Sequence, residues 1–482
     1  MSMSSALNNA VTGLTANARM AEVVSSNLSN ALTEGYGRRS VELSSVQVGD
    51  RGGGVRVDAV NRFVDAGLLA DRRLADAALS GQERSADMVL RLQQALGGAD
   101  DAAGLGARLA EVERALISAS GDPASETRLS LVVSRMQDLT LTLQSNTRSI
   151  QSLRQEADTS IARDIEVLNT ALQQVDLLNK DILRINGSGD DPSALLDARQ
   201  RAVDQIAGIV PLREVMRDNG TVGLISQTGT TLLASQPAQF GFERTATITA
   251  DMTLASGALG AITLDGQPLD LTTGIGRLDG GSLGAAFALR DQTLVEAQAG
   301  LDEIAADLVA RFQDPANDPT LAPADIGLLT DQGGLLDLGD IPGLAGRIAV
   351  NPAIVSELGG EPSLLRDGLN AAGPGPAGNT AQINNWIAAL SAARADTLGA
   401  EIRSASGRIG AFTSDIGATR IAVEDKLSFT NARWETLREA ELADGVDTDV
   451  ELQSLLRIEQ AYAANAKVIQ TVDFMMQRLM EI

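Results

Sequence analysis

The sequence predicts a mainly α-helical, elongated, multi-domain rod with a small β insertion, whose N- and C-terminal helices pair as a coiled coil. Three observations support this fold class. Seven-residue repeats of apolar or small side chains occupy both ends of the 482-residue chain. The segment between Pro123 and Pro192 contains no proline and keeps a helical repeat. Short runs rich in Val, Ile, Leu and Thr, separated by turn residues, lie between the long helical segments.

The first predicted helix presents a narrow seam of the kind that packs against another helix. Its positions form two sets with a seven-residue period: Leu7, Leu14, Ala21 and Leu28, and then Val11, Ala18, Ser25 and Leu32. The small side chains at positions 18, 21 and 25 bury far less than a Leu, whose full burial contributes about 1.5 to 3 kcal/mol. We therefore expect a helix pair built on this seam to be marginal alone and to be completed by identical copies. A self-contained helical bundle is the alternative.

The C-terminal segment carries a matching repeat. Its seam positions are Leu455, Tyr462, Ile469 and Met476, with Ile458, Asn465, Val472 and Leu479 three residues further on. No other segment of the sequence matches the first helix as well. We predict that residues 1–60 and 442–482 together form a terminal coiled-coil domain.

The segment after the first helix changes character twice. A glycine-containing break from Thr33 to Gly37 ends the helix, and Ser40 to Val60 then alternates partially, which predicts a short hairpin with Gly52 to Gly54 as its turn. Helical periodicity returns from Arg62 to Leu96 and, more briefly, near Leu109 to Ile117.

The longest predicted helix begins at Asp122, which would cap it, with Pro123 in the first turn. It ends near Gly187, and a shorter helix follows from Ser193 to Ala207. Its apolar positions keep one heptad and then a second, shifted by an inserted step of four residues: Leu129, Met136, Leu143, Ile150 and Ala157, and then Ile161, Leu168, Val175 and Ile182. Another long helix, from Ile383 to Glu441, is predicted as its partner through Leu398, Ile402, Ala405, Ile409, Phe412, Ile416 and Val423.

These helices define the remaining domains. Residues 61–207 and 283–441 are predicted to form a long-helix rod domain, in which residues 314–378, acidic and rich in Pro and Gly, form an irregular surface loop. Residues 208–282 are predicted to form a small antiparallel β domain, with turns at Asp218 to Gly220, at Gly229, at Gly241 and at Asp265-Gly266.

The charge of the chain limits its partners. The sequence has 39 basic and 63 acidic side chains, a net charge of -24, which disfavours nucleic acid and anionic membrane surfaces. Residues 1–80 hold eight basic and eight acidic groups, whereas residues 301–375 hold three and twelve. The near-neutral end is better suited to packing against copies of itself. No apolar stretch reaches the roughly 20 residues that span a bilayer, and the N-terminus lacks a basic leader followed by an apolar run.

Histidine and cysteine are both absent, which removes disulfides, imidazole bases, cysteine nucleophiles and nearly every tight zinc or iron site. None of the three lysines lies in a phosphate-binding loop. A catalytic carboxylate pair is disfavoured, because aromatic residues that could hold a sugar make up only 2% of the chain. We expect no catalytic residue, metal or cofactor. The lack of cysteine suits both the cytosol and a chain exported unfolded, so it leaves the compartment open.

Both ends of the chain resemble the signatures of the bacterial flagellar axial proteins, the family of rod, hook and hook-associated proteins. In the N-terminal signature a heptad helix ends in an Asn-rich turn followed by Gly-Tyr, matched here by Asn27, Asn30, Gly35 and Tyr36, although Glu34 stands where the family usually has Pro. The C-terminal run from Gly445 is similar to the second signature at Gln460, Tyr462, Asn465, Ala466, Thr471 and Leu479. The segments that begin at Asp191, Asp218 and Gly281 resemble the hook-filament junction branch of the family.

The resemblance implies a structural protein without catalysis, exported unfolded by the flagellar type III apparatus and secreted to the extracellular flagellum. It would self-assemble at the distal end of the hook as a helical ring or tube, in contact with the hook protein and the next hook-associated junction protein. The N-terminal seam, with residues 27, 30, 35 and 36, and the C-terminal seam would form the assembly interface. A cytoplasmic type III export chaperone would hold the C-terminal helix before secretion, and the β domain would face outward.

Two kinds of alternative stay open at this point. The terminal signatures are shared across the family, so a hook-type or rod-type axial protein is the first. A protein of another class, either a soluble coiled-coil adaptor or an acidic hydrolase, is the second. Rapid proteolytic removal of roughly residues 1–40 and 445–482 from the dilute monomer would favour the junction protein.

Overall fold

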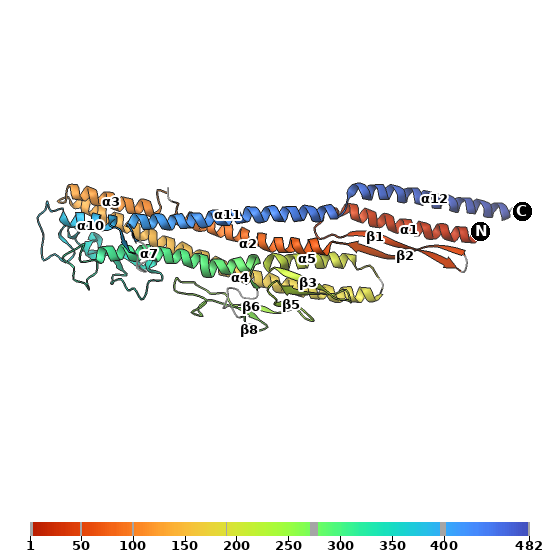
Figure 1. Cartoon of the computed structure of the whole chain (residues 1–482), viewed down its shortest axis with the longest axis horizontal. Coiled ribbons are helices and arrows are strands. Elements are labelled where there is room, and N and C mark those ends of the chain that lie inside the picture. The colour runs from red at the N-terminus through yellow and green to blue at the C-terminus, as the bar shows by residue number, and fades with distance from the viewer. Residues whose placement is uncertain are drawn as a thin grey trace.

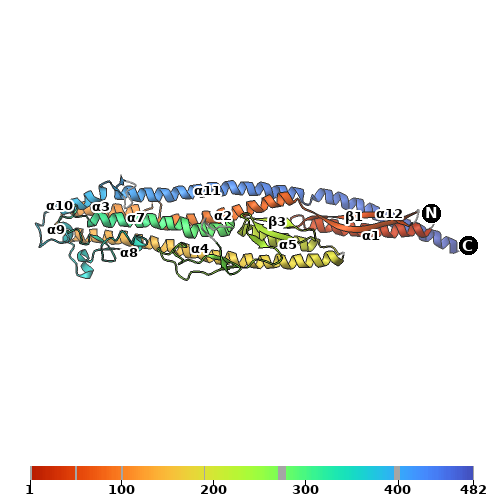
Figure 2. The same cartoon turned by 60° about the horizontal axis from the view of Figure 1, so that its bottom comes forward.

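The computed structural model describes residues 3–48, 51–98, 101–188, 190–269, 278–395 and 402–480. The chain is elongated, and both of its termini lie at the same end (Figure 1). At that end α1 (Met3–Ser29) lies beside α12 (Thr448–Met480) and covers a hairpin of β1 (Arg38–Val48) and β2 (Arg51–Phe63), an arrangement that Figure 2 shows from another side. The two ends of the chain are therefore paired, as the matching repeats predicted.

The predicted turn of the hairpin is wrong. Gly52 to Gly54 belong to β2, where Gly52 pairs with Gln47 of β1. Gly54 has a φ of +101°, and an added Cβ there would lie 2.2 Å from Oγ1 of Thr12. Gly54 therefore lets the strand approach α1 closely and serves helix packing, not chain reversal.

Long helices form the rest of the molecule. The rod contains α2 (Ala66–Leu96), α3 (Leu105–Gly121), α4 (Glu126–Ser188), α5 (Ser193–Ile209), α6 (Gly281–Ala288), the π-helical turn η2 (Leu289–Thr293), α7 (Leu294–Gln313), α10 (Ala381–Ser391) and α11 (Ala405–Asp444). All nine heptad positions predicted for the long helix are buried in α4. This confirms both heptads and the step between them, because one face of the helix is covered along its whole length.

The start of α4 differs from the prediction. Asp122 does not cap α4; it ends α3, and its carbonyl accepts a hydrogen bond from the Ser125 amide at 3.2 Å. The amides of Arg128 and Leu129, in the first turn of α4, donate to the Ser125 carbonyl. Since α3 and α4 pack against each other, the Asp-Pro segment is used to reverse the chain between them.

The prediction of one helix from Ile383 to Glu441 is also wrong. Helix α10 ends at Ser391, the two-residue strands β11 (Arg394–Ala395) and β12 (Ile402–Arg403) follow, and α11 begins after Ser404, whose hydroxyl accepts from the Gly407 amide. Leu398 lies outside the described residues, and Ile402 is exposed. The remaining seam positions are buried or half-buried, but α11 packs along α2 and not along α4 (Figure 1).

Residues 208–282 contain two three-stranded antiparallel sheets where the sequence predicted one unit. Their strands are β3 (Leu212–Met216), β4 (Val222–Ser226) and β5 (Thr231–Leu233), and β6 (Phe240–Phe242), β7 (Ile262–Leu264) and β8 (Gln267–Pro268). The turns at 218–220, at 229 and at 265–266 are confirmed, whereas Gly241 lies inside β6. Apolar side chains of both sheets share a core with α4 and α5.

Residues 314–378 are not an irregular surface loop. They form short elements, β9 (Leu329–Asp331), α8 (Leu344–Arg347), β10 (Ile348–Val350), η3 (Pro352–Ile354), η4 (Ser356–Leu358) and α9 (Leu364–Asp367). Their apolar clusters join the core of the rod, with Leu328, Ile348 and Ile354 fully buried. Apolar runs of two or three residues are too short to show a period, so this burial could not be predicted from periodicity. In the described part of the chain, no helix is long and apolar enough to cross a bilayer.

Candidate assembly interface

The turn after α1 is built around a buried amide. Asn27 is fully buried, and its side-chain oxygen accepts from the Arg39 amide at 3.0 Å and from the Tyr36 hydroxyl at 2.9 Å. Its side-chain nitrogen donates to the Arg39 carbonyl at 2.8 Å. These bonds tie the last turn of α1 to the start of β1, and they use both acceptor sites and one of the two N–H groups of this amide.

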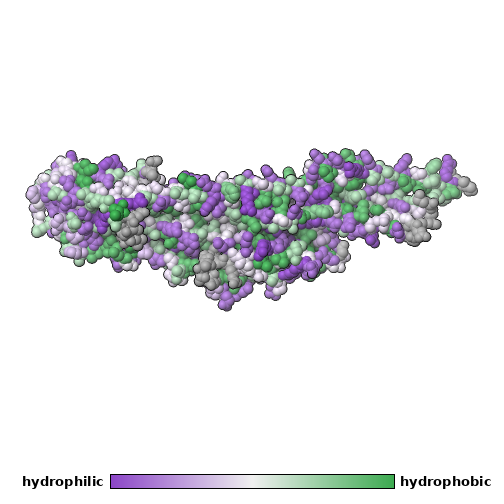
Figure 3. Space-filling view, in the orientation of Figure 1, coloured by the Kyte–Doolittle hydropathy of each residue, from purple (hydrophilic) through white to green (hydrophobic). Residues whose placement is uncertain are grey.

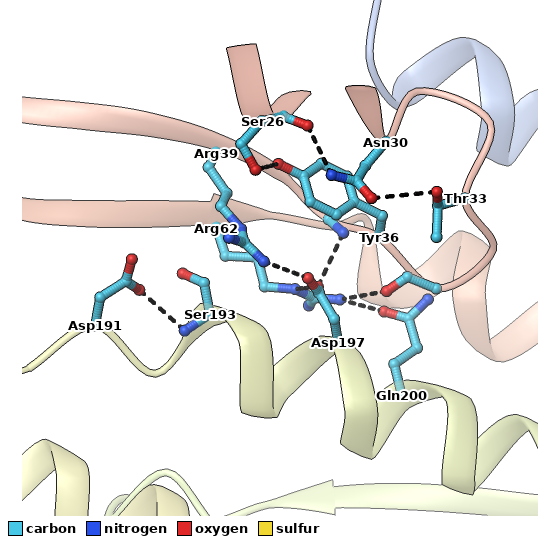
Figure 4. Close-up of polar contacts among 12 residues, drawn as sticks. Ser26, Asn30, Thr33, Tyr36, Arg39, Arg62, Asp191, Ser193, Asp197 and Gln200 are labelled. Carbon is cyan, nitrogen blue, oxygen red and sulfur yellow. Dashed lines mark hydrogen bonds and ion pairs between the residues drawn. The ribbon is translucent and has the colours of Figure 1, made fainter. Parts of the chain in front are cut away.

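The other turn residues named from the sequence lie in the same place. The side-chain amide of Asn30 donates to the Ser26 carbonyl at 2.9 Å, and the Tyr36 hydroxyl lies 3.2 Å from the Ser26 hydroxyl (Figure 4). Gly35 has a φ of +75°, and an added Cβ would lie 2.7 Å from the Arg201 side chain on α5. The structure thus brings Asn27, Asn30, Gly35 and Tyr36 together in one joint between α1, the hairpin and the rod.

A carboxylate on α5 holds this joint to the rod. Asp197, whose side chain is 6% exposed, accepts from the Gly37 amide at 3.0 Å, from Nε of Arg62 at 2.7 Å and from Nη2 of Arg39 at 2.5 Å (Figure 4). Arg62 also donates to Gln200 on α5. Sequence reasoning missed these residues, because partners more than 130 positions apart leave no local pattern.

The last helix is attached to the same joint. The acidic run before α12 caps it, since the Asp447 carboxylate accepts from the amides of Asp449 and Val450 at 2.9 and 3.1 Å. Four residues on, the nearly buried Glu451 pairs with Arg38 of β1 at 2.9 Å. Glu34, which replaces the usual Pro, pairs with Arg438 of α11 at 2.6 Å.

A charged cleft of about 700 Å³ lies between the turn after α1 and the rod helices α2, α5 and α11. On its wall Arg72 of α2 pairs with Asp76, with Asp204 at 2.8 Å and with Glu441 of α11 at 2.6 Å. Trp434 of α11 donates its indole N–H to Asp76 at 2.6 Å. Burial raises the pKa of both the Asp76 and Glu441 carboxyls above the usual range, and the Arg72 charge opposes this shift.

The seam predicted for the first helix is not the buried face of α1. Ala10, Ala16, Asn17, Val23, Val24 and Asn27 are the buried residues of this helix. One set of the predicted seam is only half-buried, namely Leu7, Leu14, Ala21 and Leu28, and the other is exposed, namely Val11, Ala18, Ser25 and Leu32. The choice of face was therefore wrong for contacts within the chain.

The seam predicted for the last helix is partly covered by α1. Ile458 and Val472 are buried, Leu455, Asn465 and Ile469 are half-buried, and Tyr462, Met476 and Leu479 are exposed. Gly13 marks the contact, because a Cβ added there would lie 2.8 Å from the Asn465 amide nitrogen. Sequence reasoning missed further exposed apolar residues of α12: Leu452, Leu456, Val468, Phe474, Met475 and Met480. Apolar and polar residues are interspersed over this end of the molecule (Figure 3).

Family models match three parts of the chain. The model of the flagellar hook-associated protein FlgK helical domain matches residues 89–317. The flagella basal body rod protein model matches residues 7–36, and the C-terminal model of the flagellar basal body rod FlgEFG protein matches residues 443–482. The rod and the two paired ends are thus matched separately.

Relatives extend the similarity over the whole chain. The flagellar hook-associated protein 1 of Escherichia coli K12 is 24% identical over an alignment of 557 positions that covers 100% of both chains. The protein of the same name from Salmonella typhimurium is 27% identical over 49% of this chain and 44% of its own length, and that from Bacillus subtilis is 24% identical over 42% of each.

The fold is similar to that of a solved protein, the flagellar hook junction protein FlgK from Burkholderia pseudomallei. The TM-score is 0.58 at 14% sequence identity, over 77% of this chain and 99% of that one. With the family models and the full-length relative, this likeness identifies the chain as a member of the flagellar hook-associated protein 1 family, a structural component of the hook-filament junction of the bacterial flagellum.

Proposed function

We propose that this protein self-assembles at the distal end of the hook, where the α1–α12 pairs of identical copies line the wall of a tube. The observation that carries this proposal is the incomplete packing of the terminal pair. Nine apolar side chains of α12, from Leu452 to Met480, are more than 40% exposed: Leu452, Leu456, Tyr462, Val468, Phe474, Met475, Met476, Leu479 and Met480. So many exposed large apolar side chains on one helix are typical of an interface.

The partners that we propose follow from this placement. The protein would contact copies of itself, the hook protein on one side and the next hook-associated junction protein on the other. Before secretion, a cytoplasmic type III export chaperone would cover α12, because its exposed apolar side chains would otherwise associate in the cytosol. The assembled protein would be extracellular.

The proposed division of the chain has three parts. Residues 1–60 and 442–482 would form the inner tube, residues 61–207 and 283–441 the next shell, and the β segment 208–282 the outer surface. No catalytic role is proposed, because the chain has neither histidine nor cysteine and its buried charges serve as structural ion pairs, such as Arg290 with Asp158 at 2.6 Å. Loss of the protein should therefore cause a defect in flagellar assembly and not the loss of an enzymatic activity.

Deletion of the gene followed by electron microscopy tests the function. We expect intact hooks that lack filaments, with filaments restored by the full chain. The chain without residues 448–480 should not restore them, although the rod has its own core and should still fold. Normal filaments in the deletion strain would refute the proposal.

A further inference from the structure

A cavity of about 400 Å³ lies between three segments that are distant in the sequence. They are the loop between β6 and β7, the first half of α7, and the residues just before α8. Its apolar wall consists of Ala250, Val295, Ala299, Ile341 and Pro342. Sites that bind small molecules typically have volumes of about 300 to 1,000 Å³ and mostly apolar walls. This cavity therefore has the size and the wall of a small-ligand site.

Carboxylates supply the charge of the cavity. Asp251, Asp302 and Glu303 line it, and none of the described residues in its lining is basic. Glu303 is paired with Arg408 at 3.2 Å, and Asp251 is exposed. Asp302 differs from both, because it is only 2% exposed. The cavity therefore offers one buried acidic group beside an apolar wall.

Three N–H groups bind the Asp302 carboxylate. Its Oδ1 accepts from the Ala345 amide and from the Gln298 side chain, both at 2.9 Å, and its Oδ2 accepts from the Gly343 amide at 2.8 Å. A carboxylate has about four acceptor sites, so one site on Oδ2 is left. That site suits a single N–H donor better than the two parallel N–H groups of a guanidinium.

The Asp302 carboxylate has no cation beside it. Buried carboxylates are normally paired with cations, but within the described part of the chain Asp302 forms no ion pair. Arg347, whose charge acts on it from further away, is held by Asp331 at 2.9 Å and by Asp340 at 3.3 Å. Burial accordingly raises the pKa of the Asp302 carboxyl above its usual range. A cation in the cavity would stabilise the ionised form.

We propose that this cavity binds an alkylammonium group, whose charged end donates to Oδ2 of Asp302 while its methylene chain packs on the apolar wall. Two sources share this chemistry, namely a free primary amine and the lysine side chain of another protein. A metal ion is disfavoured, because it would find one buried carboxylate and would leave the apolar wall uncovered. The cavity lies within one chain, so this site goes beyond the proposed function and does not depend on it.

Calorimetric titration of the full chain with hexylamine tests the proposal. The comparison ligand is 1-hexanol, which has the same length but no charge. In about 0.15 M NaCl, which screens the surface charge of the protein, we expect hexylamine to bind one site at least about tenfold more tightly than 1-hexanol. Equal affinities, or no saturable binding of hexylamine, would overturn the proposal.

Two matched alanine variants separate the cavity from the acidic surface. Ala299→Phe fills the cavity and keeps every charge, whereas Ala422→Phe places the same side chain on α11. Both alanines are exposed on helices, so neither change should shift the thermal midpoint. The affinity for hexylamine should fall at least about tenfold in Ala299→Phe and stay unchanged in Ala422→Phe, because only the first removes apolar contacts of the ligand. Equal affinities in the two variants would count against the cavity and overturn the proposal.

Asp302→Asn tests the charge. This variant should lose the preference for hexylamine over 1-hexanol while it still binds 1-hexanol, and a retained preference would overturn the proposal. Its thermal midpoint is measured in parallel, because an amide cannot accept all three hydrogen bonds of the carboxylate. If this variant does not fold, the comparison of Ala299→Phe with Ala422→Phe decides.

A lysine derivative, Nα-acetyl-L-lysine methylamide, distinguishes the two sources. Tighter binding of this compound than of hexylamine would support the proposal and assign the cavity to a lysine side chain of a partner protein. The reverse order would support it and assign the cavity to a free amine. If neither compound bound, the proposal would be overturned and the proposed assembly would stand, since that function is tested by filament formation.

Discussion

At the scale of single residues, the joint between the terminal pair and the rod depends on buried polar groups whose bonds are satisfied. Asn27 joins α1 to β1, and Asp197 joins the hairpin to α5 through Arg39 and Arg62. A buried carboxylate is tolerated only where cations and amides surround it. The direction of the terminal pair relative to the rod is thus fixed by a few specific contacts.

Replacement of Asp197 by Asn should loosen this joint. The change leaves two arginines, 14% and 15% exposed, without their carboxylate, which costs about 3 kcal/mol. We expect hydrogen exchange of the hairpin amides to become about 100-fold faster. Asp181→Asn, which removes an exposed pair with Arg184 on α4, should have almost no effect on exchange. Similar exchange in both variants would contradict the role of Asp197.

The cleft beside the joint should respond to pH. Burial raises the pKa of Glu441, so the folded protein binds this proton more tightly than the unfolded chain does. The resulting stabilisation is fully present below the pKa of Glu in the unfolded chain, about 4.3. That contribution is lost as the pH rises through the folded pKa. Relative to Glu441→Gln, the wild type should therefore lose stability as the pH rises above about 4.3.

Trp434 offers a local readout of this effect, because its indole contacts Asp76 in the same cluster. Trp386 is replaced by Phe in every variant, so that Trp434 is the remaining tryptophan. The midpoint of urea unfolding, monitored by Trp434 fluorescence, is then measured as a function of pH. Glu424→Gln, which alters an exposed pair with Arg420, should follow the pH dependence of its parent chain. If the wild type instead became more stable relative to Glu441→Gln as the pH rises, the predicted direction of the pH dependence would be wrong.

At the scale of elements, helix α2 is packed between α11 on one side and α5 and α6 on the other. Close approach to α6 depends on Gly81, where an added Cβ would lie 2.9 Å from the Gly281 carbonyl oxygen. Backbone cannot move away from that contact as a flexible side chain could. In α11, by contrast, a Cβ added at Gly410 would meet nothing within 4 Å.

The two glycines should therefore respond oppositely to alanine. Gly81→Ala should lower the free energy of unfolding by about 1 to 3 kcal/mol, because the helices must separate to admit a methyl group. Gly410→Ala should raise it by about 0.5 to 1 kcal/mol, because alanine restricts the unfolded chain and favours the helix. Urea unfolding followed by circular dichroism measures both changes. Two shifts of the same sign would contradict the close approach of α2 and α6.

At the scale of the whole molecule, charge and apolar surface are separated along the long axis. The end that holds both termini is nearly neutral and exposes apolar side chains, whereas the rest of the chain carries most of the net charge of -24. Assembly must therefore overcome repulsion between rods of neighbouring copies while it gains contacts at the terminal end.

Salt should consequently promote assembly. Between about 0.01 M and 0.15 M NaCl the Debye length falls from about 30 Å to about 8 Å, which screens repulsion between rods but hardly affects apolar contacts. Sedimentation of the full chain should show a larger assembled fraction at the higher concentration. Neutralising the exposed carboxylates of Asp337 and Asp340 by Asn should weaken the salt dependence. Assembly that falls with added salt would contradict this balance.

Local patterns in the sequence were sufficient for several features of the fold and the interface. The heptads of α4 predicted its buried face correctly, because a long helix covered along one side needs an apolar residue at each turn. Three of the four turns of the β segment and the paired termini could also be predicted, and the terminal motifs identified the family. These features depend on residues close in the chain or on recognisable motifs.

The sequence by itself determined where most of the long helices lie, which ends pair and to which family the chain belongs. Only the tertiary structure decided that α11 packs on α2, that Asp197 binds Arg39 and Arg62, and that α1 buries a face other than its predicted heptad seam. Periodicity is a property of one helix and shows that a face needs a partner. Which partner covers that face depends on contacts between distant segments.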